Sequence, residues 1–428
     1  MSVHRISPLL AALTILAPYS AAQTPPAVTT LYTFTGQNGD GASPNGGVVP
    51  GPKGALYGTT EFGGSSAACL TNGCGTVFAL EPSGPGGGTW IESILHNFTS
   101  SDGATPDAGV VIGQGGVLYG TTYAGGAYGC YDCGTVFELV PPAAALATPG
   151  GTWTEDVLHS FGGPGDASGP QTGLVVGGNG ALYGTTLGPG GGTVFELRPP
   201  SASGGAWTEI ILHTFTSGHG DGVTPSGTIA LGANRALYGA TLVGGAYGQG
   251  TVFELSPPAT RAGPWKETVL YSFTGGGDGA NPYAGVVLGA HGAIYGTTQE
   301  GGGTGNGVVF ELTPPAAPGG AWTESVLYNF CSAFDCSDGY VPYASLLFAQ
   351  GTLYGATYMG GASNEGALFE LQPPPVPGEA WTYTVLYSFT LVHGAFPSGP
   401  LFMDKDGEIY GTTFSGWDGP GTVFKLTP

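Results

Sequence analysis

Six aspartates stand at matching positions of a repeated phrase, each four residues before a proline. Five of the phrases read DGxxP and one reads DASGP; the aspartates are Asp40, Asp102, Asp166, Asp221, Asp278 and Asp338. A ring of such carboxylates could bind Ca²⁺ or accept hydrogen bonds from sugar hydroxyls. The alternative is that each aspartate accepts backbone N–H groups of its own turn. Calcium loops present several oxygen ligands from one short segment, so we expect no cofactor, with calcium as the alternative.

The six cysteines fall in three local pairs. The pairs are Cys69 and Cys74, Cys130 and Cys133, and Cys331 and Cys336. In an exported protein such spacing indicates disulfides that brace loops. The alternative is a zinc site built from the four thiolates of the first two pairs, because the C-x-x-C spacing also suits zinc. We favour disulfides, since an exported chain meets an oxidising compartment.

Aromatic residues follow a second repeated phrase, LYGTT or a close variant. Tyr123 and Tyr358 come directly after it, and Trp417 lies further along the last such segment. Aromatic rings beside polar groups hold sugar rings or peptide side chains, although these rings could instead pack glycine-rich loops. We predict a ligand-binding set of Asp102, Asp221, Asp278, Asp338, Tyr123, Tyr358 and Trp417.

Three titratable residues break the repeat and could serve as acid and base. They are His219, Glu61 and Glu300. No GxSxG, HExxH or phosphate-binding motif accompanies them, so we assign no catalytic residue and rank binding ahead of catalysis. A pocket that joins one of the three to another titratable group would favour a polysaccharide hydrolase or lyase. A shallow groove repeated around the molecule would favour binding.

The LYGTT phrase recurs seven times and defines the architecture. Its copies begin at Leu56, Leu118, Leu182, Leu237, Ile294, Leu353 and Ile409. Each unit holds four strand-like phrases separated by Gly and Pro, as in a propeller blade. In the fifth unit the four strands are expected at Ala284–Gly289, Ala293–Thr298, Gly307–Leu312 and Trp322–Phe330.

The seventh unit lacks its fourth strand, and the missing strand stands at the other end of the chain. Residues Val28–Phe34 (VTTLYTF) match the fourth-strand ending VLYSF. An N-terminal strand in the last blade would close the ring and remove exposed sheet edges. We therefore predict an all-β fold: residues 23–428 form a single seven-bladed β-propeller with four antiparallel strands per blade, and residues 28–34 complete the last blade.

Antiparallel order divides the loops between two faces. The loops from strand one to two and from three to four share a Pro-rich face. Those from two to three and from four to one share the opposite face, with the DGxxP aspartates and all six cysteines. We expect function on the second face, because its loops vary most in length while the strands hardly change.

The repeat unit resembles a known family. Residues Val269–Pro315 are similar to the GloVer tandem repeat of secreted bacterial "choice-of-anchor" proteins, and the resemblance covers essentially all of the chain after residue 22. It implies a propeller-like extracellular protein without an established activity, so no catalytic residue is carried over. The array reaches Pro428 without the anchor segment that often follows it, which leaves surface attachment open.

Charge and the N-terminal segment restrict the partners and the compartment. With 8 Lys and Arg against 29 Asp and Glu, the net charge is −21 and no basic cluster exists. A nucleic-acid partner is excluded, because binding phosphates requires cations. Residues 1–22 have the basic start, apolar run and small residues of a signal peptide, and no later stretch reaches the ~20 apolar residues of a membrane span. We expect a monomer, secreted or periplasmic, that binds an extracellular glycan or protein.

Overall fold

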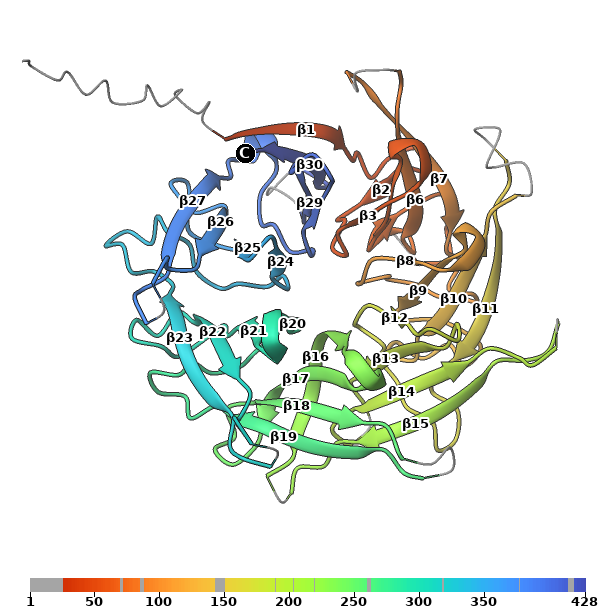
Figure 1. Ribbon diagram of the computed structural model, residues 1–428. Coiled ribbons are helices and arrows are strands. Elements are labelled where there is room, and N and C mark those ends of the chain that lie inside the picture. Colours follow the sequence, from red (N-terminus) through yellow and green to blue (C-terminus); the bar gives the residue numbers. More distant parts are fainter. Residues whose placement is uncertain are drawn as a thin grey trace, which may run out of the picture.

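The computed structural model describes residues 26–69, 72–84, 88–142, 151–188, 190–202, 204–218, 220–259, 263–317, 319–376, 378–414 and 419–428. The predicted signal peptide lies outside the described residues, as do His219 and Trp417. Seven four-stranded antiparallel sheets stand in a ring (Figure 1), and their innermost strands line a central channel. The predicted all-β, seven-bladed propeller is confirmed.

The blades follow one another along the chain, and in each the first-named strand lines the channel. The first three consist of β3 (Val48–Pro50), β4 (Leu56–Thr60), β6 (Thr76–Pro82) and β7 (Trp90–Asn97); β8 (Val111–Ile112), β9 (Leu118–Thr122), β10 (Thr135–Val140) and β11 (Thr154–Ser160); and β12 (Val175–Val176), β13 (Leu182–Thr186), β14 (Thr193–Arg198) and β15 (Thr208–Thr214). The next three consist of β16 (Gly222–Leu231), β17 (Leu237–Gly244), β18 (Thr251–Ser256) and β19 (Lys266–Ser272); β20 (Val287–Leu288), β21 (Ile294–Thr297), β22 (Val308–Thr313) and β23 (Thr323–Asn329); and β24 (Leu347–Ala349), β25 (Thr352–Thr357), β26 (Ala367–Gln372) and β27 (Thr382–Ser388). The seventh blade consists of β28 (Phe402–Met403), β29 (Ile409–Thr413), β30 (Thr422–Thr427) and β1 (Ala27–Thr33). A small extra pair, β2 (Gly41–Ala42) and β5 (Phe62–Gly63), joins two loops of the first blade.

The N-terminal strand closes the ring. Strand β1 pairs antiparallel with β30, with Val28 opposite Leu426 and Thr33 opposite Thr422. In Figure 1 the red β1 lies beside the dark blue β30, so segments from the two ends of the chain share one sheet. The following residue, Phe34, is buried and meets Phe78 of the first blade edge-on, with ring centroids 5.0 Å apart. Hydrogen bonds thus hold the N-terminal strand in the seventh blade, and the packing of Phe34 on Phe78 joins that blade to the first.

The LYGTT phrase recurs because its residues are buried between neighbouring blades. All five residues of β4 are buried, on both faces of the sheet. The glycine makes room for the phenylalanine of the third strand: a Cβ on Gly58 would lie 2.5 Å from Phe78 Cζ, and one on Gly184 would lie 2.7 Å from Phe195 Cζ. The same close approach exists in every blade, so the glycine is a packing requirement.

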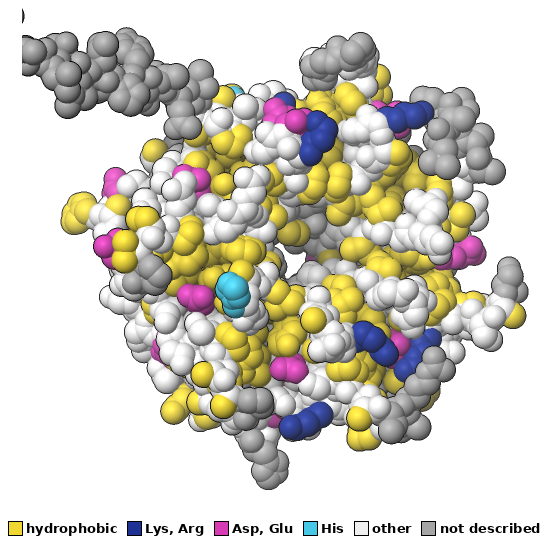
Figure 2. All heavy atoms as spheres, in the orientation of Figure 1, with side chains coloured by type: hydrophobic (Ala, Val, Ile, Leu, Met, Phe, Trp, Pro, Cys, Tyr) yellow, Lys and Arg dark blue, Asp and Glu magenta, His cyan; other side chains and the backbone are white. Residues whose placement is uncertain are grey.

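The two faces of the ring differ in charge. Every described Lys and Arg lies at the Pro-rich end of a strand or in a loop of the Pro-rich face: these are Lys53, Arg198, Arg235, Lys266, Lys405 and Lys425. Figure 2 shows that face, with its dark blue Lys and Arg and with hydrophobic side chains around the central hollow. The opposite face, called the disulfide face below, carries no described Lys or Arg.

Candidate functional site

A cavity of about 460 Å³ opens where the channel meets the disulfide face. Two positions of the repeat supply most of its side chains: the residue after each DGxxP-type proline and the residue after each LYGTT phrase. The first position contributes Asn45, Asp107, Gln171, Ser226, Tyr283, Tyr343 and Ser398, and the second contributes Glu61, Leu187, Leu242, Tyr358 and Phe414. A second, apolar space of about 550 Å³ in the channel is lined by the innermost strands.

A recurring turn directs these side chains inward. The residue before each proline has a left-handed backbone, with φ of 53° at Thr105, 59° at Thr224 and 55° at Val341. Its carbonyl accepts the backbone N–H of the residue after LYGTT, as from Tyr123 to Thr105 at 2.9 Å. β-branched residues rarely adopt this conformation, so the surrounding loops must impose it. The turn therefore fixes both positions that line the cavity.

One wall of the cavity is acidic. Gln171 donates a hydrogen bond from Nε2 to Asp107 Oδ2 at 3.2 Å, and burial raises the pKa of Asp107 to about 6 against the lowering effect of this bond. Burial, and then the charge of Asp107, raise the pKa of Glu61 to about 7. Among the described residues, no side chain forms a hydrogen bond or ion pair with the Glu61 carboxyl group. Two carboxyl groups without a cation thus converge in one cavity.

The opposite wall is aromatic. Tyr283 and Tyr343 meet edge-on with centroids 4.6 Å apart, Tyr343 and Tyr358 lie 4.9 Å apart, and Tyr358 stacks on Phe396 at 4.9 Å. Burial raises the pKa of Tyr283 to about 12, with further contributions from Tyr343, Asp107 and Glu61. The negative charges of the acidic wall therefore disfavour ionisation of Tyr283 on the aromatic wall of the same cavity.

Of the predicted ligand-binding residues, Tyr358 lines this cavity and the four aspartates do not. Each aspartate accepts a backbone N–H of its own loop: Asp102 from Thr99 at 2.7 Å, Asp221 from Thr216 at 2.9 Å, Asp278 from Thr274 at 2.8 Å and Asp338 from Ser332 at 2.7 Å. These are the contacts expected of turn-forming aspartates. A ligand-facing role for them stays a prediction, as it does for Tyr123, whose ring meets Tyr131 with centroids 6.1 Å apart.

The aspartates also join neighbouring blades. In the loop after six of the seven fourth strands, a strand histidine or tyrosine contacts the aspartate, as in His159–Asp166 at 3.1 Å and Tyr271–Asp278 at 3.0 Å. After β27 the contact is instead between Tyr387 and His393, at 3.0 Å. The His96–Asp102 and His159–Asp166 pairs each meet a glutamate of the next blade, Glu155 or Glu209, with ligand atoms within 4.8 Å of one another. Such a trio could hold a metal ion. Tyrosine takes the place of histidine in other blades, which favours a packing role instead.

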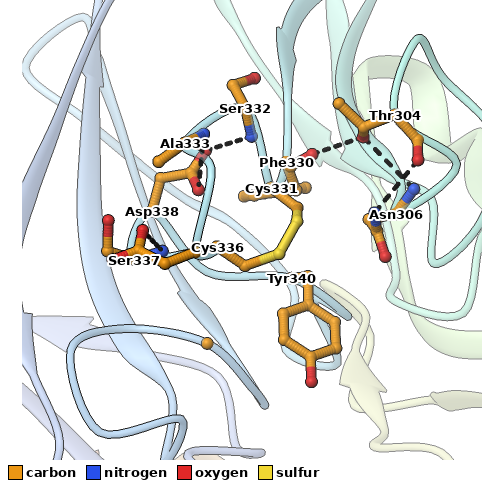
Figure 3. The surroundings of a disulfide bond; sticks show 12 residues. Thr304, Asn306, Phe330, Cys331, Ser332, Ala333, Cys336, Ser337, Asp338 and Tyr340 are labelled. Atoms are coloured by element: carbon orange, nitrogen blue, oxygen red, sulfur yellow. Dashed lines mark hydrogen bonds between the residues drawn. A yellow bond between two sulfur atoms is a disulfide. The ribbon is translucent and has the colours of Figure 1, made fainter.

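The predicted disulfides are confirmed: Cys69–Cys74, Cys130–Cys133 and Cys331–Cys336 are bonded, and no described cysteine is free. Figure 3 shows that the third disulfide encloses the loop whose N–H groups, at Ser332 and Ala333, donate to Asp338. All three disulfides lie in loops of the face on which the cavity opens. Two of them adjoin the turns that precede cavity-lining residues, because the carbonyls of Cys74 and Cys133 accept the backbone N–H groups of Thr105 and Gly169. The third lies in the loop that leads to Tyr343.

Sequence reasoning identified Glu61 and Tyr358 but missed Asp107, Tyr283 and Tyr343. The available signal was variation: in an otherwise uniform repeat, the residue after the proline is Asn, Asp, Gln, Ser, Tyr, Tyr and Ser in the seven copies. Glu300, in contrast, is exposed outside the cavity. The convergence of Glu61 with a second titratable group is the feature that was expected to favour an enzyme.

The repeat places the chain in a family. A model of the Gloeobacter/Verrucomicrobia repeat matches residues 19–186, 131–333 and 262–428, which together reach from the N-terminal segment to the C-terminus. The chain belongs to the Gloeobacter/Verrucomicrobia repeat family. No curated protein matches the sequence.

Solved structures with similar architecture are distant in sequence. A fungal alcohol oxidase in complex with copper has a TM-score of 0.55 at 15% identity, over 94% of this chain and 76% of that one. A polysaccharide lyase has a TM-score of 0.53 at 13% identity, over 95% and 93%. The PQQ-bound aldose sugar dehydrogenase of Streptomyces coelicolor has a TM-score of 0.46 at 14% identity, over 94% and 98%. At these identities the likeness concerns the fold alone. Within the described residues, no helix has the length and apolar character needed to cross a membrane.

Proposed function

We propose that this member of the Gloeobacter/Verrucomicrobia repeat family is an extracellular carbohydrate-binding propeller whose ligand enters the central cavity from the disulfide face. The facing walls of this cavity carry the proposal. The aromatic rings offer an apolar surface to a sugar ring. The carboxyl and amide groups opposite them can accept hydrogen bonds from sugar hydroxyls, and the amide N–H groups can donate hydrogen bonds to them. The volume lies in the range of about 300–1,000 Å³ that is usual for small-molecule sites. The three disulfides and the repeat family support an extracellular location.

A glycan array followed by calorimetry tests this proposal. The chain from residue 23 onward is screened, and the best oligosaccharide is titrated into Tyr283→Ala and Tyr247→Ala variants. Tyr247 is the matched control, because it is 62% exposed on the same face and does not line the cavity. Loss of an anchoring ring should weaken binding by about 2 kcal/mol or more, whereas the control should bind like the parent. Equal affinities for both variants would contradict the proposal.

A second candidate function is that of a polysaccharide hydrolase or lyase, which the pair of carboxyl groups favours. Burial raises the pKa of Glu61 to about 7 and that of Asp107 to about 6, so Glu61 keeps its proton to a higher pH than Asp107 does. An acid and a carboxylate in one cavity are the groups that glycoside hydrolysis uses. Incubation of bound oligosaccharides with the parent and with Glu61→Gln decides: product formed by the parent and not by the variant indicates an enzyme.

A further inference from the structure

The central cavity has a charge that its own residues do not balance. Glu61 and Asp107 line it, and none of its described lining residues is Lys, Arg or His. Asp107 receives one hydrogen bond from a neutral amide, and the Glu61 carboxyl group receives none from a described residue. Burying carboxylates without a counter-charge is costly, and the cost is removed when an opposite charge enters the site.

We propose that the sugar bound in this cavity is an amino sugar, whose protonated amine lies between Glu61 and Asp107 while its ring packs on Tyr283 and Tyr343. This inference rests on the proposed carbohydrate-binding function and names the class of sugar. A neutral sugar would leave the carboxyl groups unbalanced. A uronic acid would bring a further negative charge to an acidic cavity that offers no cation among its described lining residues.

The rest of the molecule favours the same class of ligand. The net charge is −21, and the described Lys and Arg side chains all lie toward the Pro-rich face. The disulfide face therefore attracts cations and repels anions over the length of the approach. Tyr283 lines the same cavity as both carboxyl groups, so a sugar whose ring packs on Tyr283 can direct its amine toward Glu61 and Asp107. An ammonium group near a tyrosine face gains cation–π attraction in addition.

Binding of an amine should also move protons. The pKa values of Glu61 and Asp107 are raised by burial, so near neutral pH these carboxyl groups are partly protonated when no ligand is bound. A bound ammonium group stabilises the ionised carboxylates and expels that proton. A neutral sugar has no such effect.

The test compares a short glucosamine oligosaccharide with its N-acetylated counterpart of the same length and with a uronate oligosaccharide. Calorimetry is carried out at about pH 5.5 in two buffers of different ionisation enthalpy, because neighbouring oxygen atoms lower the pKa of a sugar amine well below that of lysine and the amine must be protonated before it binds. The parent should bind the free amine at least about tenfold more tightly than the N-acetylated sugar, with proton release for the amine alone. Short oligomers are used because a strongly acidic protein attracts long polycations over its whole surface.

Variants separate this inference from the function on which it rests. Glu61→Gln should weaken binding of the amine about tenfold and leave the N-acetylated sugar within about twofold. Glu300→Gln, on the exposed disulfide face, is the matched control and should change neither. If the N-acetylated sugar or the uronate binds as tightly as the amine, or if Glu61→Gln weakens both equally, the amine inference is wrong although carbohydrate binding stands. If none of the three oligosaccharides binds although another glycan of the array does, the amine inference is wrong and carbohydrate binding stands. If no glycan of the array binds, or if Tyr343→Ala binds the best glycan unchanged, the proposed function itself fails.

Discussion

Gln171 of one blade donates a hydrogen bond to the carboxylate of Asp107 in the preceding blade, 3.2 Å away. Both residues directly follow the proline of their repeat, so the same backbone turn places them beside each other at the mouth of the channel. A scaffold that repeats seven times thus turns one variable position into a ring of different side chains. The chemistry of the cavity depends on which residues fill that ring, and the repeat itself needs none of them.

Closure of the ring by the N-terminal strand makes a testable contribution to stability. Phe34 is 1% exposed and packs against Phe78 of the first blade. Phe34→Ala should lower the free energy of unfolding by about 3–5 kcal/mol, because it leaves a cavity between the seventh and first blades. Urea denaturation measures the change. Thr33→Ala, at an exposed position of the same strand, should stay within about 0.5 kcal/mol. A loss below about 1 kcal/mol for Phe34→Ala would show that the closure is not a main source of stability.

The glycine of LYGTT should not tolerate a methyl group. In Gly184→Ala the new Cβ would lie 2.7 Å from Phe195 Cζ and 3.0 Å from Leu174 Cδ2, so we expect destabilisation of about 1–3 kcal/mol. Gly178→Ala is the control, because nothing lies within 4 Å of its Cβ position. The double variant Gly184→Ala/Phe195→Leu should lose less stability than the sum of the losses in the two single variants, because leucine removes the ring atom that the new methyl group would meet. Simple additivity would argue against the clash.

Stability should fall as the pH rises through neutrality. Burial is the main cause that raises the pKa of five interblade glutamates above 4.5, to about 7 for Glu92, Glu155, Glu267 and Glu324 and to about 8 for Glu209. Between about pH 4.5 and pH 7 to 8, these glutamates are protonated in the folded chain and ionised in the unfolded chain. The stability that the protonated glutamates contribute is complete below about pH 4.5 and is lost as the pH rises past about 7 to 8.

Urea denaturation at pH 5 and pH 8 checks this dependence. The parent should be less stable at the higher pH, and Glu155→Gln should reduce the difference by on the order of 1 kcal/mol. Glu379→Gln, at an exposed loop position, should leave the difference unchanged. Higher stability at pH 8 than at pH 5 would contradict the account of the blade interfaces.

The disulfides should matter more for binding than for folding. Each closes a loop with a sequence separation of 3 or 5, and short loops give a disulfide little entropy to remove from the unfolded chain. Cys331→Ser/Cys336→Ser should therefore cost less than about 3 kcal/mol in stability while weakening ligand binding, since the loops at the cavity mouth loosen. Thermal denaturation and calorimetry on the same sample measure both. Unfolding of the variant at room temperature, or unchanged binding, would contradict this division.

Much of the fold could be predicted from the sequence because the repeat is regular. Seven copies of LYGTT give seven blades, and the missing fourth strand in the last copy identifies Val28–Phe34 as its replacement. The division into two faces follows from antiparallel order. These features depend on local pattern and count, which a sequence records directly.

The cavity could be predicted only in part, because a repeated residue and a functional residue look alike in one sequence. The DGxxP aspartates attracted attention by their charge, yet their carboxylates accept N–H groups of their own loops. Asp107 stands five residues after Asp102, but the left-handed turn at Thr105 directs it into the channel. Such a backbone conformation at a β-branched residue is imposed by tertiary contacts, and propensity does not reveal it.

A structure of the protein with a bound oligosaccharide tests the central claim most directly. We predict that the sugar lies in the central cavity, with its ring against Tyr283 or Tyr343 and its polar groups toward Glu61 and Asp107. Diffraction from crystals soaked with the best ligand of the array would show this position. A sugar bound at the Pro-rich face, or at the outer loops around Tyr128 and Tyr131 with the central cavity empty, would contradict the account.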